Sequence, residues 1–353
     1  MKKQLIEQAI ALLKNLIEIQ SFSSEEEGTA LLIENWFKGY NIPFKRSENN
    51  IWATNKYFDQ SKPTLLLNSH HDTVMPNKGY TKDPFKAIVE DGKLYGLGSN
   101  DAGGCLVSLM ATFTYFYQKP NLNYNLVIVA SAEEESSGKN GLNSMLSILP
   151  KIDVAIVGEP TLMQLAIAEK GLVVFDATVA GTSSHAAHPN EDNPIYNTIN
   201  VLEWFRDFKF EKTSETLGDV KMTVTQINAG KQHNAVPSAV DLVVDVRVND
   251  AYSNQEIAAL LEKEAPCELT PRSLRLNSSS IPLEHPLVQS GIALGITTYG
   301  SPTLSDQAVL NCPSLKLGPG DSRRSHTADE FIYLSEIEEG IKIYIELLES
   351  VLK

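Results

Sequence analysis

The sequence predicts an α/β fold into which a second, smaller domain is inserted. Residues 1–170 alternate helical and strand patterns, which is typical of a mixed, mostly parallel sheet flanked by helices. Residues 171–280 give the order strand-helix-strand-strand-helix-strand, which is that of an α+β split βαβ sandwich of the ferredoxin type. A strand and a long helix follow within residues 281–353, and we expect them to rejoin the first sheet. The first domain would therefore be discontinuous, formed by residues 1–170 and 281–353.

The elements of the first domain follow from apolar patterns. Apolar residues at helical spacing predict helices near 3–18 and 26–39. The pair Gly103-Gly104 begins a further helix. Short apolar runs predict strands near 51–55, 64–69, 126–130 and 153–157. A short helix is expected near 139–148, between the last two strands.

The inserted domain begins where Val173 and Phe175 alternate with their neighbours, as in a half-buried strand. Its remaining elements are helices near 193–207 and 253–264 and strands near 220–228, 239–248 and 267–276. The serine-rich segment 277–282 predicts a linker. The chain then returns to the first sheet with a strand at 314–317 and a final helix at 334–352.

Composition restricts the class of protein. With 353 residues and 42% hydrophobic content, the chain is long enough for two domains with a substantial core. The formal net charge of -14 argues against a nucleic-acid partner, because affinity for the phosphate backbone comes from Lys and Arg. The charge does not exclude a small-molecule substrate, since a pocket can be basic on an acidic protein.

Cysteine use and hydropathy predict a cytoplasmic protein. Cys105, Cys267 and Cys312 form no CxxC pair, so we expect no disulfide framework and a reducing compartment. Charged residues interrupt residues 1–20, which predicts an amphipathic surface helix rather than a signal peptide. No run in the sequence approaches the roughly 18 apolar residues of a membrane span, so we expect no membrane partner.

Histidines and carboxylates follow the predicted strands at the point where each strand ends. These groups are His70-His71-Asp72, Glu133-Glu134-Glu135, Glu159 and His326, each past an apolar run. Asp101 instead follows the glycine-rich segment Tyr95-Gly96-Leu97-Gly98. Open α/β sheets bind ligands at the carboxyl ends of their strands, so we expect these side chains to converge. Imidazole and carboxylate ligands suit a divalent metal ion.

Each fragment also has a simpler interpretation. A single histidine after a strand is more often a satisfied polar residue, but the spacing His70-x-Asp72 suits a metal-bound imidazole that donates to a carboxylate. The glutamate triplet would usually be a solvated charge run, yet at the end of a buried strand its carboxylates repel unless a cation offsets them. The turn Gly96-x-Gly98-x-x-Asp101 imitates a dinucleotide-binding loop, but Asp101 would repel a pyrophosphate. Five such fragments together favour a metal centre.

Together the motifs resemble the zinc-dependent acetylornithine deacetylase, succinyl-diaminopimelate desuccinylase and aminoacylase family. The resemblance covers nearly the whole chain, including the inserted domain, and implies a zinc-exopeptidase-like catalytic domain. The motifs that carry it are His70-His71-Asp72-Thr73-Val74, Tyr95-Gly96-Leu97-Gly98-Ser99-Asn100-Asp101, Glu133-Glu134-Glu135, Gly158-Glu159-Pro160-Thr161 and His326-Thr327-Ala328-Asp329-Glu330.

The resemblance implies two divalent metal ions per chain, zinc in first place, with cobalt able to substitute. The first ion would be held by His70, Asp101 and Glu159, and the second by Asp101, Glu135 and His326. Asp72 would orient His70, and Glu134 would be the general base of amide hydrolysis. Within the triplet, the assignment of base and ligand could be reversed. The family often has Asp-Met-Lys-Gly after the bridging aspartate; here the segment is Asp101-Ala102-Gly103-Gly104, so any role of that lysine is absent or taken elsewhere.

The resemblance also gives the inserted domain a role as lid and dimerisation domain. His185 would help to bind the oxyanion, often in the active site of the partner subunit. Asn234 and Arg247 match positions that contact the substrate carboxylate, and the planar guanidinium suits that contact. The alternative for Arg247 is an ion pair on the strand surface. Because a four-stranded sheet offers an exposed edge, we expect a homodimer formed through residues 171–280.

Three further residues would contact the substrate from the first domain. Gly318 and Gly320 permit close backbone approach to a ligand, although a plain turn explains them equally well. Asp306 follows Ser305 in a segment that resembles a pocket-lining part of the family, and it could face a cationic side chain.

These features predict a metal-dependent hydrolase that removes the acyl group from an N-acyl amino acid. The segment Pro302–Glu330 resembles acetylornithine deacetylase most, which implies hydrolysis of N-acetylornithine to ornithine and acetate in arginine biosynthesis. An N-acetylcitrulline deacetylase, a desuccinylase or a dipeptidase stays open, because a single pocket residue could accept or reject the extra carboxymethyl of a succinyl group. A non-catalytic metal or ligand-binding homologue would be expected to lack a ligand or the base, and this chain has them all.

Overall fold

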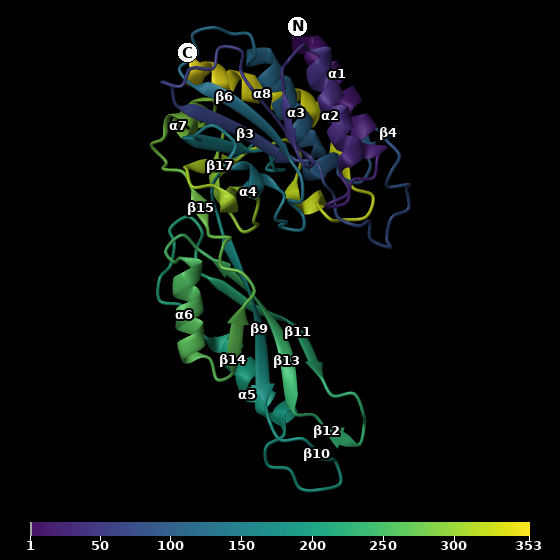
Figure 1. The fold of residues 1–353 in the computed structure, drawn as a ribbon, viewed down its shortest axis with the longest axis vertical. Coiled ribbons are helices and arrows are strands. Elements are labelled where there is room, and N and C mark those ends of the chain that lie inside the picture. The colour runs from purple at the N-terminus through teal and green to yellow at the C-terminus, as the bar shows by residue number, and fades with distance from the viewer. Residues whose placement is uncertain (1) are drawn as a thin grey trace. The chain divides into compact units, whose positions relative to one another are not determined.

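The chain divides between two units in the computed structural model, which describes residues 2–353 (Figure 1). The first unit comprises Met1–Ile167, Ser280–Tyr299 and Ser305–Lys353. The second comprises Ala168–Ser279 and Gly300–Leu304. The five residues from Gly300 to Leu304 thus group with the second unit, although they lie far from its other residues in sequence.

A mixed sheet of nine strands organises the first unit. In order across the sheet the strands are β1 (Lys45–Ser47), β2 (Asn50–Thr54), β6 (Asn125–Ser131), β3 (Thr64–His70), β7 (Val154–Val157), β17 (Ser314–Lys316), β8 (Leu165–Glu169) and β15 (Ser279–Ser280), with β16 (Thr298–Ser301) paired to β8. The four central strands β6, β3, β7 and β17 are parallel. Pairing is antiparallel from β6 through β2 to β1 and from β17 to β8. The predicted α/β class with a mixed sheet is confirmed, and its parallel part is the centre.

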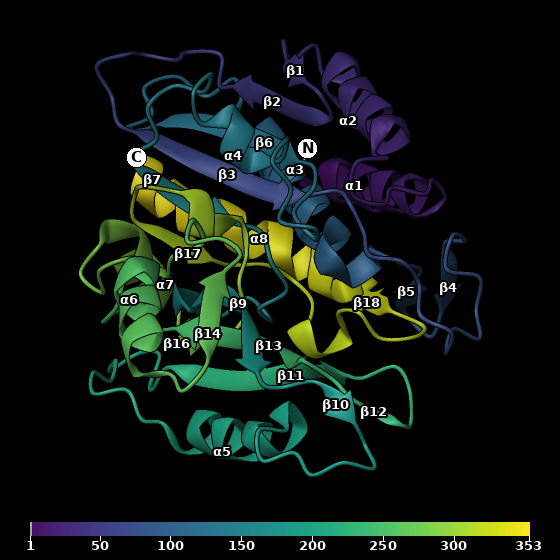
Figure 2. The same ribbon diagram turned by 60° about the horizontal axis from the view of Figure 1, so that its bottom comes forward.

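Successive side chains of β3 point to opposite faces of this sheet. Leu65 and Leu67 join the large apolar cluster that packs with long helices, whereas Leu66 packs with Trp52 and Met145 on the other face. The helices of the first face are α1 (Lys2–Ile17), α2 (Glu27–Gly39), α3 (Gly104–Phe116), α7 (Pro286–Ala293) and α8 (Leu334–Leu352); α4 (Leu142–Met145) lies on the second. Figure 2 shows α8 crossing behind the strands. Because both faces are covered, polar side chains of the central strands gather at the strand ends.

A smaller sheet aligns two segments that carry metal-binding motifs. Its strands, in order, are β18 (Phe331–Tyr333), β5 (Lys93–Tyr95) and β4 (Ile88–Glu90), all antiparallel. Phe331 pairs with Tyr95, so the chain that follows His326 lies beside the chain that leads to Asp101. The sequence did not predict these strands, because three residues give no periodic signal.

The second unit has the predicted split βαβ order, which is confirmed. Its elements are β9 (Gly171–Ala180), α5 (Pro194–Asp207), β11 (Lys221–Ala229), β13 (Ala239–Val248), α6 (Asn254–Glu264) and β14 (Glu268–Pro271). The sheet order is β11-β13-β9-β14, with every pair antiparallel. Phe175 and Val244 share one apolar core with Val201 of α5 and Leu261 of α6, so both helices cover one sheet face. A separate pair, β10 (Ser184–His185) with β12 (Ala235–Val236), extends this unit.

Some elements differ from the sequence prediction. The strand expected over 267–276 is only β14, which ends at Pro271, although the N–H of Arg272 still donates to the carbonyl of Val174 at 2.9 Å. The predicted linker 277–282 contains β15, which adds a strand to the large sheet. Helix α7 and strands β8 and β16 were not predicted. Short helical turns complete the fold: η1 (Ser99–Gly103), η2 (Asp306–Val309) and η3 (Ser322–Arg324). Among residues 2–353, no helix combines the length and apolarity that crossing a bilayer requires.

Candidate metal centre

The first unit contains two groups of side chains that could each hold a metal ion. Within each group, the possible ligand atoms lie within 4.8 Å of one another. One group is His70, Asp101 and Glu159, and the other is Asp101, Glu135 and His326. His70 ends β3, while Glu135 and Glu159 follow β6 and β7, which flank β3 and run parallel to it. The carboxyl ends of parallel strands meet at one edge of the sheet, which is why these residues converge. Asp101 belongs to both groups and is placed to bridge two ions.

Asp101 reaches this edge from a tight turn rather than from a strand. Gly96 and Gly98 in the turn have φ of +146° and +74°, in the region that favours glycine. The buried carboxylate of Glu330 accepts hydrogen bonds from the backbone N–H groups of Gly98, Asn100 and Asp101, at 3.1, 2.8 and 2.9 Å. The peptide bond that follows Asp101 is cis. A carboxylate from the far end of the chain therefore holds the backbone of the bridging aspartate.

His70 is buried, and its two ring nitrogens face different partners. Its Nε2 is 3.3 Å from Asp101 Oδ1, 3.9 Å from Glu159 Oε1 and 4.0 Å from Glu134 Oε2. Its Nδ1 is 3.1 Å from the backbone oxygen of Asp72 and 3.4 Å from the Oδ1 of the same residue. This is the arrangement of a metal ligand whose second nitrogen is held by an outer partner.

His326 comes from the loop after η3, and its side chain is 55% exposed. Its Nε2 is 3.0 Å from Glu135 Oε2 and 3.7 Å from Asp101 Oδ2. The residue has φ of +58°, which is uncommon outside glycine, and its backbone carbonyl accepts a hydrogen bond from Asn77 Nδ2 at 3.2 Å. Hydrogen bonding to Glu135 raises the pKa of His326 to about 9. Without a metal ion, His326 therefore carries a proton at neutral pH.

The three glutamates of the triplet have different surroundings. The carboxylate of Glu133 accepts hydrogen bonds from the side chains of Ser24 and Asn140, away from the ligand groups. Glu135 belongs to the second ligand group. Glu134 belongs to neither group, yet its Oε2 lies 4.0 Å from His70 Nε2. Within the triplet, Glu135 is thus the member of a ligand group, and Glu134 stands beside both groups without belonging to either.

Asp72 connects His70 with the triplet. Its buried carboxylate accepts hydrogen bonds from the backbone N–H groups of Glu134 and Glu135, both at 3.1 Å, and from Ser23 Oγ at 2.7 Å. Burial opposes the ionisation of Asp72, but hydrogen bonding to His70 lowers its pKa below the usual value. One anion thus orients the imidazole and fixes the backbone of both glutamates.

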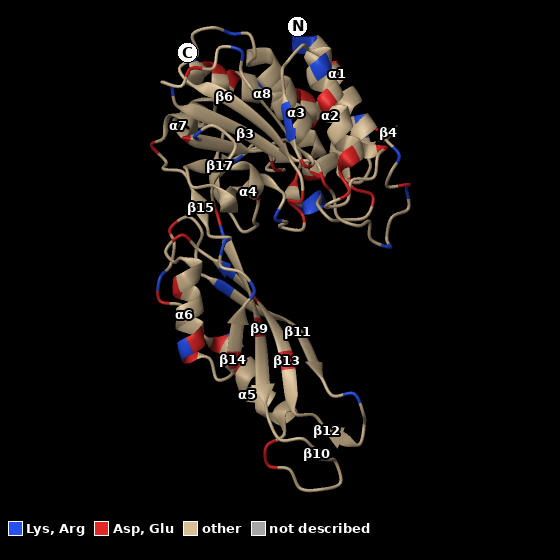
Figure 3. Cartoon of the chain, in the orientation of Figure 1, with Lys and Arg blue, Asp and Glu red and all other residues tan. Residues whose placement is uncertain are grey.

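Acidic residues crowd this edge of the sheet, and acidic segments gather around these loops in Figure 3. Burial raises the pKa of Glu134 well above its usual value, and the nearby carboxylates of Glu159 and Asp306 add to the effect. Burial, together with the charge of Asp101, raises the pKa of Glu159 to about 8. A bound cation relieves such repulsion, and mixed carboxylate and imidazole donors suit zinc and related divalent ions. The residues present therefore fit two divalent metal ions.

Asp306, predicted to contact substrate, lies beside this cluster in the first unit. It is 9% exposed. Its Oδ2 accepts hydrogen bonds from Asn68 Nδ2 at 2.8 Å and from Ser131 Oγ at 2.6 Å. Asn68 and Ser131 belong to β3 and β6, so Asp306 faces the same strands that deliver His70 and the triplet.

The two predicted glycines approach the protein itself. A Cβ atom on Gly318 would lie 2.5 Å from Cys105 Sγ, and one on Gly320 would lie 2.5 Å from Asn100 Oδ1. Gly320 also has φ of +91°. Close packing against the turn of the bridging aspartate and the start of α3 therefore requires glycine at both positions, whether or not a ligand also approaches them.

The other predicted substrate contacts belong to the second unit. His185 is exposed, and its Nδ1 accepts a hydrogen bond from the backbone N–H of Ala187 at 3.1 Å. Asn234 is exposed in the segment before β12. Arg247 donates from Nε and Nη2 to the two oxygens of Asp245, at 2.9 and 3.0 Å. Arg247 thus forms the strand-surface ion pair that the sequence left open, and substrate contacts of these three residues stay predictions.

Two buried residues at the site, Glu330 and Asn100, received no role from the sequence. Their hydrogen-bond partners are distant in the chain, since Glu330 holds the backbone around Asp101 and Asn100 contacts Asp321. No local pattern encodes such pairings. In the sequence, only their positions could have drawn attention to these two residues. Asn100 directly precedes the predicted ligand Asp101, and Glu330 is the last residue of the motif that begins with His326.

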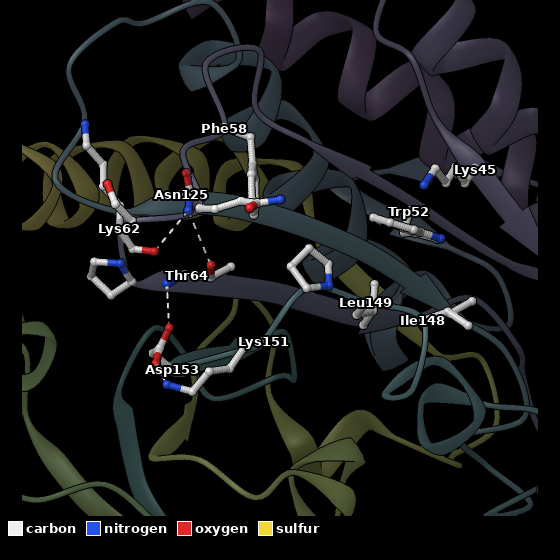
Figure 4. Close-up of a pocket in the computed structure, with 14 residues that line it drawn as sticks. Lys45, Trp52, Phe58, Lys62, Thr64, Asn125, Ile148, Leu149, Lys151 and Asp153 are labelled. Atoms are coloured by element: carbon white, nitrogen blue, oxygen red, sulfur yellow. Dashed lines mark hydrogen bonds and ion pairs between the residues drawn. The ribbon is translucent and has the colours of Figure 1, made fainter.

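A pocket of about 670 Å³ lies at the other ends of the same strands (Figure 4). Thr64 and Asn125, the first residues of β3 and β6, line it. Its three lysines already contact the protein: Lys45 lies over the ring of Trp52, Lys62 donates to the carbonyl of Leu122, and Lys151 pairs with Asp153. None of the predicted site residues lines this pocket, so it is separate from the candidate metal centre.

Comparison with curated proteins finds relatives of two kinds. The succinyl-diaminopimelate desuccinylase of Rickettsia bellii is 26% identical over 96% of this chain and 96% of its own length. The acetylornithine deacetylase of Proteus mirabilis is 27% identical over 97% of this chain and 96% of its own length. The chain is therefore similar, over nearly its whole length, both to a desuccinylase and to a deacetylase.

A solved structure and a family model complete the comparison. The YXEP protein of Bacillus subtilis, described as a dinuclear metal binding peptidase of the M20 family, has a TM-score of 0.75 at 15% identity and covers 99% of both chains, which shows a shared fold. The model of peptidase family M20/M25/M40 matches residues 66–350, a range that includes all five candidate ligands and Glu134. The chain belongs to peptidase family M20/M25/M40 and is a metallopeptidase-family hydrolase.

Proposed function

We propose that this protein hydrolyses the amide bond of an N-acyl amino acid, and that its substrate is N-acetylornithine, which gives ornithine and acetate for arginine biosynthesis. One observation carries the hydrolytic part of the proposal. Asp101 is shared by two metal-ligand groups, and Glu134 stands beside them without belonging to either. A cytoplasmic location accompanies this proposal as a prediction.

The first group, His70, Asp101 and Glu159, would hold one ion, and Asp101, Glu135 and His326 would hold the second. We propose zinc, with cobalt able to substitute, because both accept this donor set. When bound, a pair of divalent ions lowers the pKa of water and polarises a carbonyl group.

Glu134 is proposed as the residue that moves the proton. Its carboxylate lies near His70 but outside both ligand groups, so an oxygen stays available to accept a proton from the attacking water. Burial and neighbouring carboxylates raise the pKa of Glu134, which makes it a better proton acceptor than an exposed glutamate. The same oxygen can then return the proton to the departing amine. Asp72 keeps Glu134 in place through its backbone N–H.

The choice of an acetyl group and an ornithine side chain rests on fewer residues. The segment Pro302–Glu330 resembles acetylornithine deacetylase most, and it contains the buried carboxylate of Asp306, which could face the cationic side chain of ornithine. The relatives named for succinyl and acetyl substrates are nearly equally similar, at 26% and 27% identity. A desuccinylase is therefore the second candidate, and N-acetylcitrulline or a dipeptide is a further alternative substrate.

A hydrolysis panel tests the proposed substrate. Purified protein supplied with zinc or cobalt is offered the N-acetyl and N-succinyl forms of ornithine, citrulline and diaminopimelate, together with dipeptides. N-acetylornithine should have the highest kcat/KM, activity should disappear in a chelator, and added metal should restore it. Preference for a succinylated substrate would contradict the proposed substrate but not the reaction. Absence of hydrolysis of every amide by the metal-loaded protein would overturn the reaction itself.

Substitutions in the triplet separate the base from the ligand. Glu134→Ala should lower kcat by about 10²–10⁴-fold while two metal ions per chain stay bound, because it removes the proton acceptor only. Glu135→Ala should instead reduce the metal content to one ion per chain. Metal content measured by mass spectrometry, alongside turnover, decides the matter. If Glu134→Ala lost a metal ion and Glu135→Ala kept both, the two roles would have to be exchanged.

Zinc binding to the metal-free protein should release protons. His326, with a pKa of about 9, and Glu159, with a pKa of about 8, hold protons at neutral pH, and a metal ion must displace them. Proton competition weakens as the pH rises towards these values, so zinc affinity should increase with pH. Calorimetric titration in buffers of different ionisation enthalpy measures the protons released, and His326→Ala should release fewer. Binding with neither proton release nor pH dependence would contradict this electrostatic account.

We also propose that the chain forms a homodimer through residues 171–280. In the second unit, Ile195, Tyr196 and Ile199 of α5 are 44%, 69% and 56% exposed, and Ile227 of β11 is 56% exposed. Strand β11 is at the edge of its sheet, and α5 packs beside it. Exposed apolar side chains next to an unpaired strand edge support an interface here.

Sedimentation tests the dimer. The unmodified protein should sediment as a dimer at micromolar concentration, and Ile199→Glu should shift it towards the monomer because a charge cannot be buried in an apolar contact. Leu31→Glu, at a leucine of the first unit that is 45% exposed, is the control and should stay dimeric. A monomeric unmodified protein would exclude the dimer, and with it any contribution of His185 to the site of a partner subunit.

A further inference from the structure

The side chain of Asn100 pairs with the backbone of Asp321 as a neighbouring strand would. Asn100 Oδ1 accepts a hydrogen bond from the Asp321 N–H at 3.0 Å, and Asn100 Nδ2 donates to the Asp321 carbonyl at 3.1 Å. Nδ2 also lies 3.4 Å from Ser325 Oγ. Asn100 is completely buried, so these contacts are shielded from water. Two segments separated by more than two hundred residues are therefore joined by one amide.

The joined segment leads directly to His326. Asp321 caps η3, because its Oδ1 accepts a hydrogen bond from the N–H of Arg323 at 3.0 Å. Ser325, the residue before His326, is the third contact of Asn100. A Cβ atom on Gly320 would lie 2.5 Å from Asn100 Oδ1. Because glycine has none, the segment that contains Asn100 and the segment that contains Asp321 can approach closely. The amide of Asn100 thus fixes both ends of the turn that presents His326.

The backbone of Asp101 is held by a different group, and its carboxylate also interacts with the side chain of Ser325. Its backbone N–H donates to Glu330 Oε1 at 2.9 Å, and this contact does not involve the side chain of Asn100. His70 and Glu159 lie at the ends of β3 and β7, which the central sheet holds. Loss of the Asn100 amide should consequently loosen His326 relative to Asp101, while His70, Asp101 and Glu159 keep their places.

We propose that Asn100 is a positioning residue that sets the affinity of the second metal site, the one formed by Asp101, Glu135 and His326, without setting that of the first. This inference rests on the proposed metal centre. The side chain of Asn100 is a neutral amide and offers no charge to a metal ion. Even so, it would control the metal affinity of one of the two sites, although both sites share Asp101 as a ligand.

The test is calorimetric titration of the metal-free protein with zinc. Asn100→Ala should leave one site at its original affinity and weaken the other on the order of 10–100-fold, the usual effect of removing an outer partner of a metal ligand. Excess zinc should restore occupancy of the weakened site and turnover together, with KM little changed. Gly320→Ala places a Cβ against Asn100 Oδ1 and should weaken the same site. This variant replaces Asn100→Ala in the test if Asn100→Ala does not fold.

Asn125→Ala is the matched control. Asn125 is also buried, and its side-chain amide makes the same pair of hydrogen bonds to the backbone of one residue. Its Oδ1 accepts from the N–H of Asp59 and its Nδ2 donates to the Asp59 carbonyl, both at 2.8 Å. It lies at the beginning of β6, the strand end away from the ligands, where Figure 4 shows it beside Thr64. Its loss should lower thermal stability as Asn100→Ala does, yet leave both zinc affinities unchanged.

The outcomes separate this inference from the metal centre itself. If the unmodified protein binds fewer than two zinc ions, the proposed metal centre fails. If the unmodified protein binds two zinc ions, the role of Asn100 would be overturned by either of two results. One is that Asn100→Ala binds zinc at both sites as tightly as the unmodified protein, and the other is that it loses affinity equally at both sites. A second site weakened as much by Asn125→Ala would show a general effect of stability and would overturn it as well.

Discussion

Repulsion between partly buried carboxylates is the constraint on which the rest of the site depends. Asp101, Glu134, Glu135 and Glu159 converge at one edge of the sheet, where their side chains are only 9–15% exposed, so water screens them less than at an open surface. Desolvation raises the pKa values of Glu134 and Glu159, and the neighbouring carboxylates raise them further. Such a cluster is stable in its ionised form only with cations among the oxygens. The arrangement of these carboxylates therefore favours bound cations.

Two further carboxylates keep the cluster in shape without belonging to a ligand group. Asp72 and Glu330 each accept hydrogen bonds from backbone N–H groups, Asp72 from Glu134 and Glu135, and Glu330 from the turn around Asp101. Each therefore fixes the main chain from which a ligand or the base projects. Asn100 does the same with a neutral amide for the segment of His326. These contacts engage the main chain next to the candidate ligands rather than their donor atoms.

The reaction and the substrate are encoded in different parts of the molecule. His70, Glu134, Glu135 and Glu159 lie at or just past the ends of central strands, Asp101 and His326 come from turns, and the family match spans all of them. Relatives named for two different acyl groups are similar to this chain to almost the same degree. This is the expected pattern when one kind of hydrolytic centre serves several substrates and other side chains select among them.

The sequence by itself determined the fold class, the split βαβ order and the identity of the convergent residues, because each rests on local patterns: apolar periodicity, and polar residues placed just past the strands. The sequence, through the resemblance, assigned Glu135 as a ligand but left that assignment open to reversal. Tertiary structure brings Glu135 into a ligand group, whereas Ser24 and Asn140 engage Glu133. It also decided the three-residue strands β4, β5 and β18, which have no periodicity to detect. The roles of Glu330 and Asn100 were likewise fixed only in three dimensions, because hydrogen bonds between distant segments leave no trace in the spacing of residues.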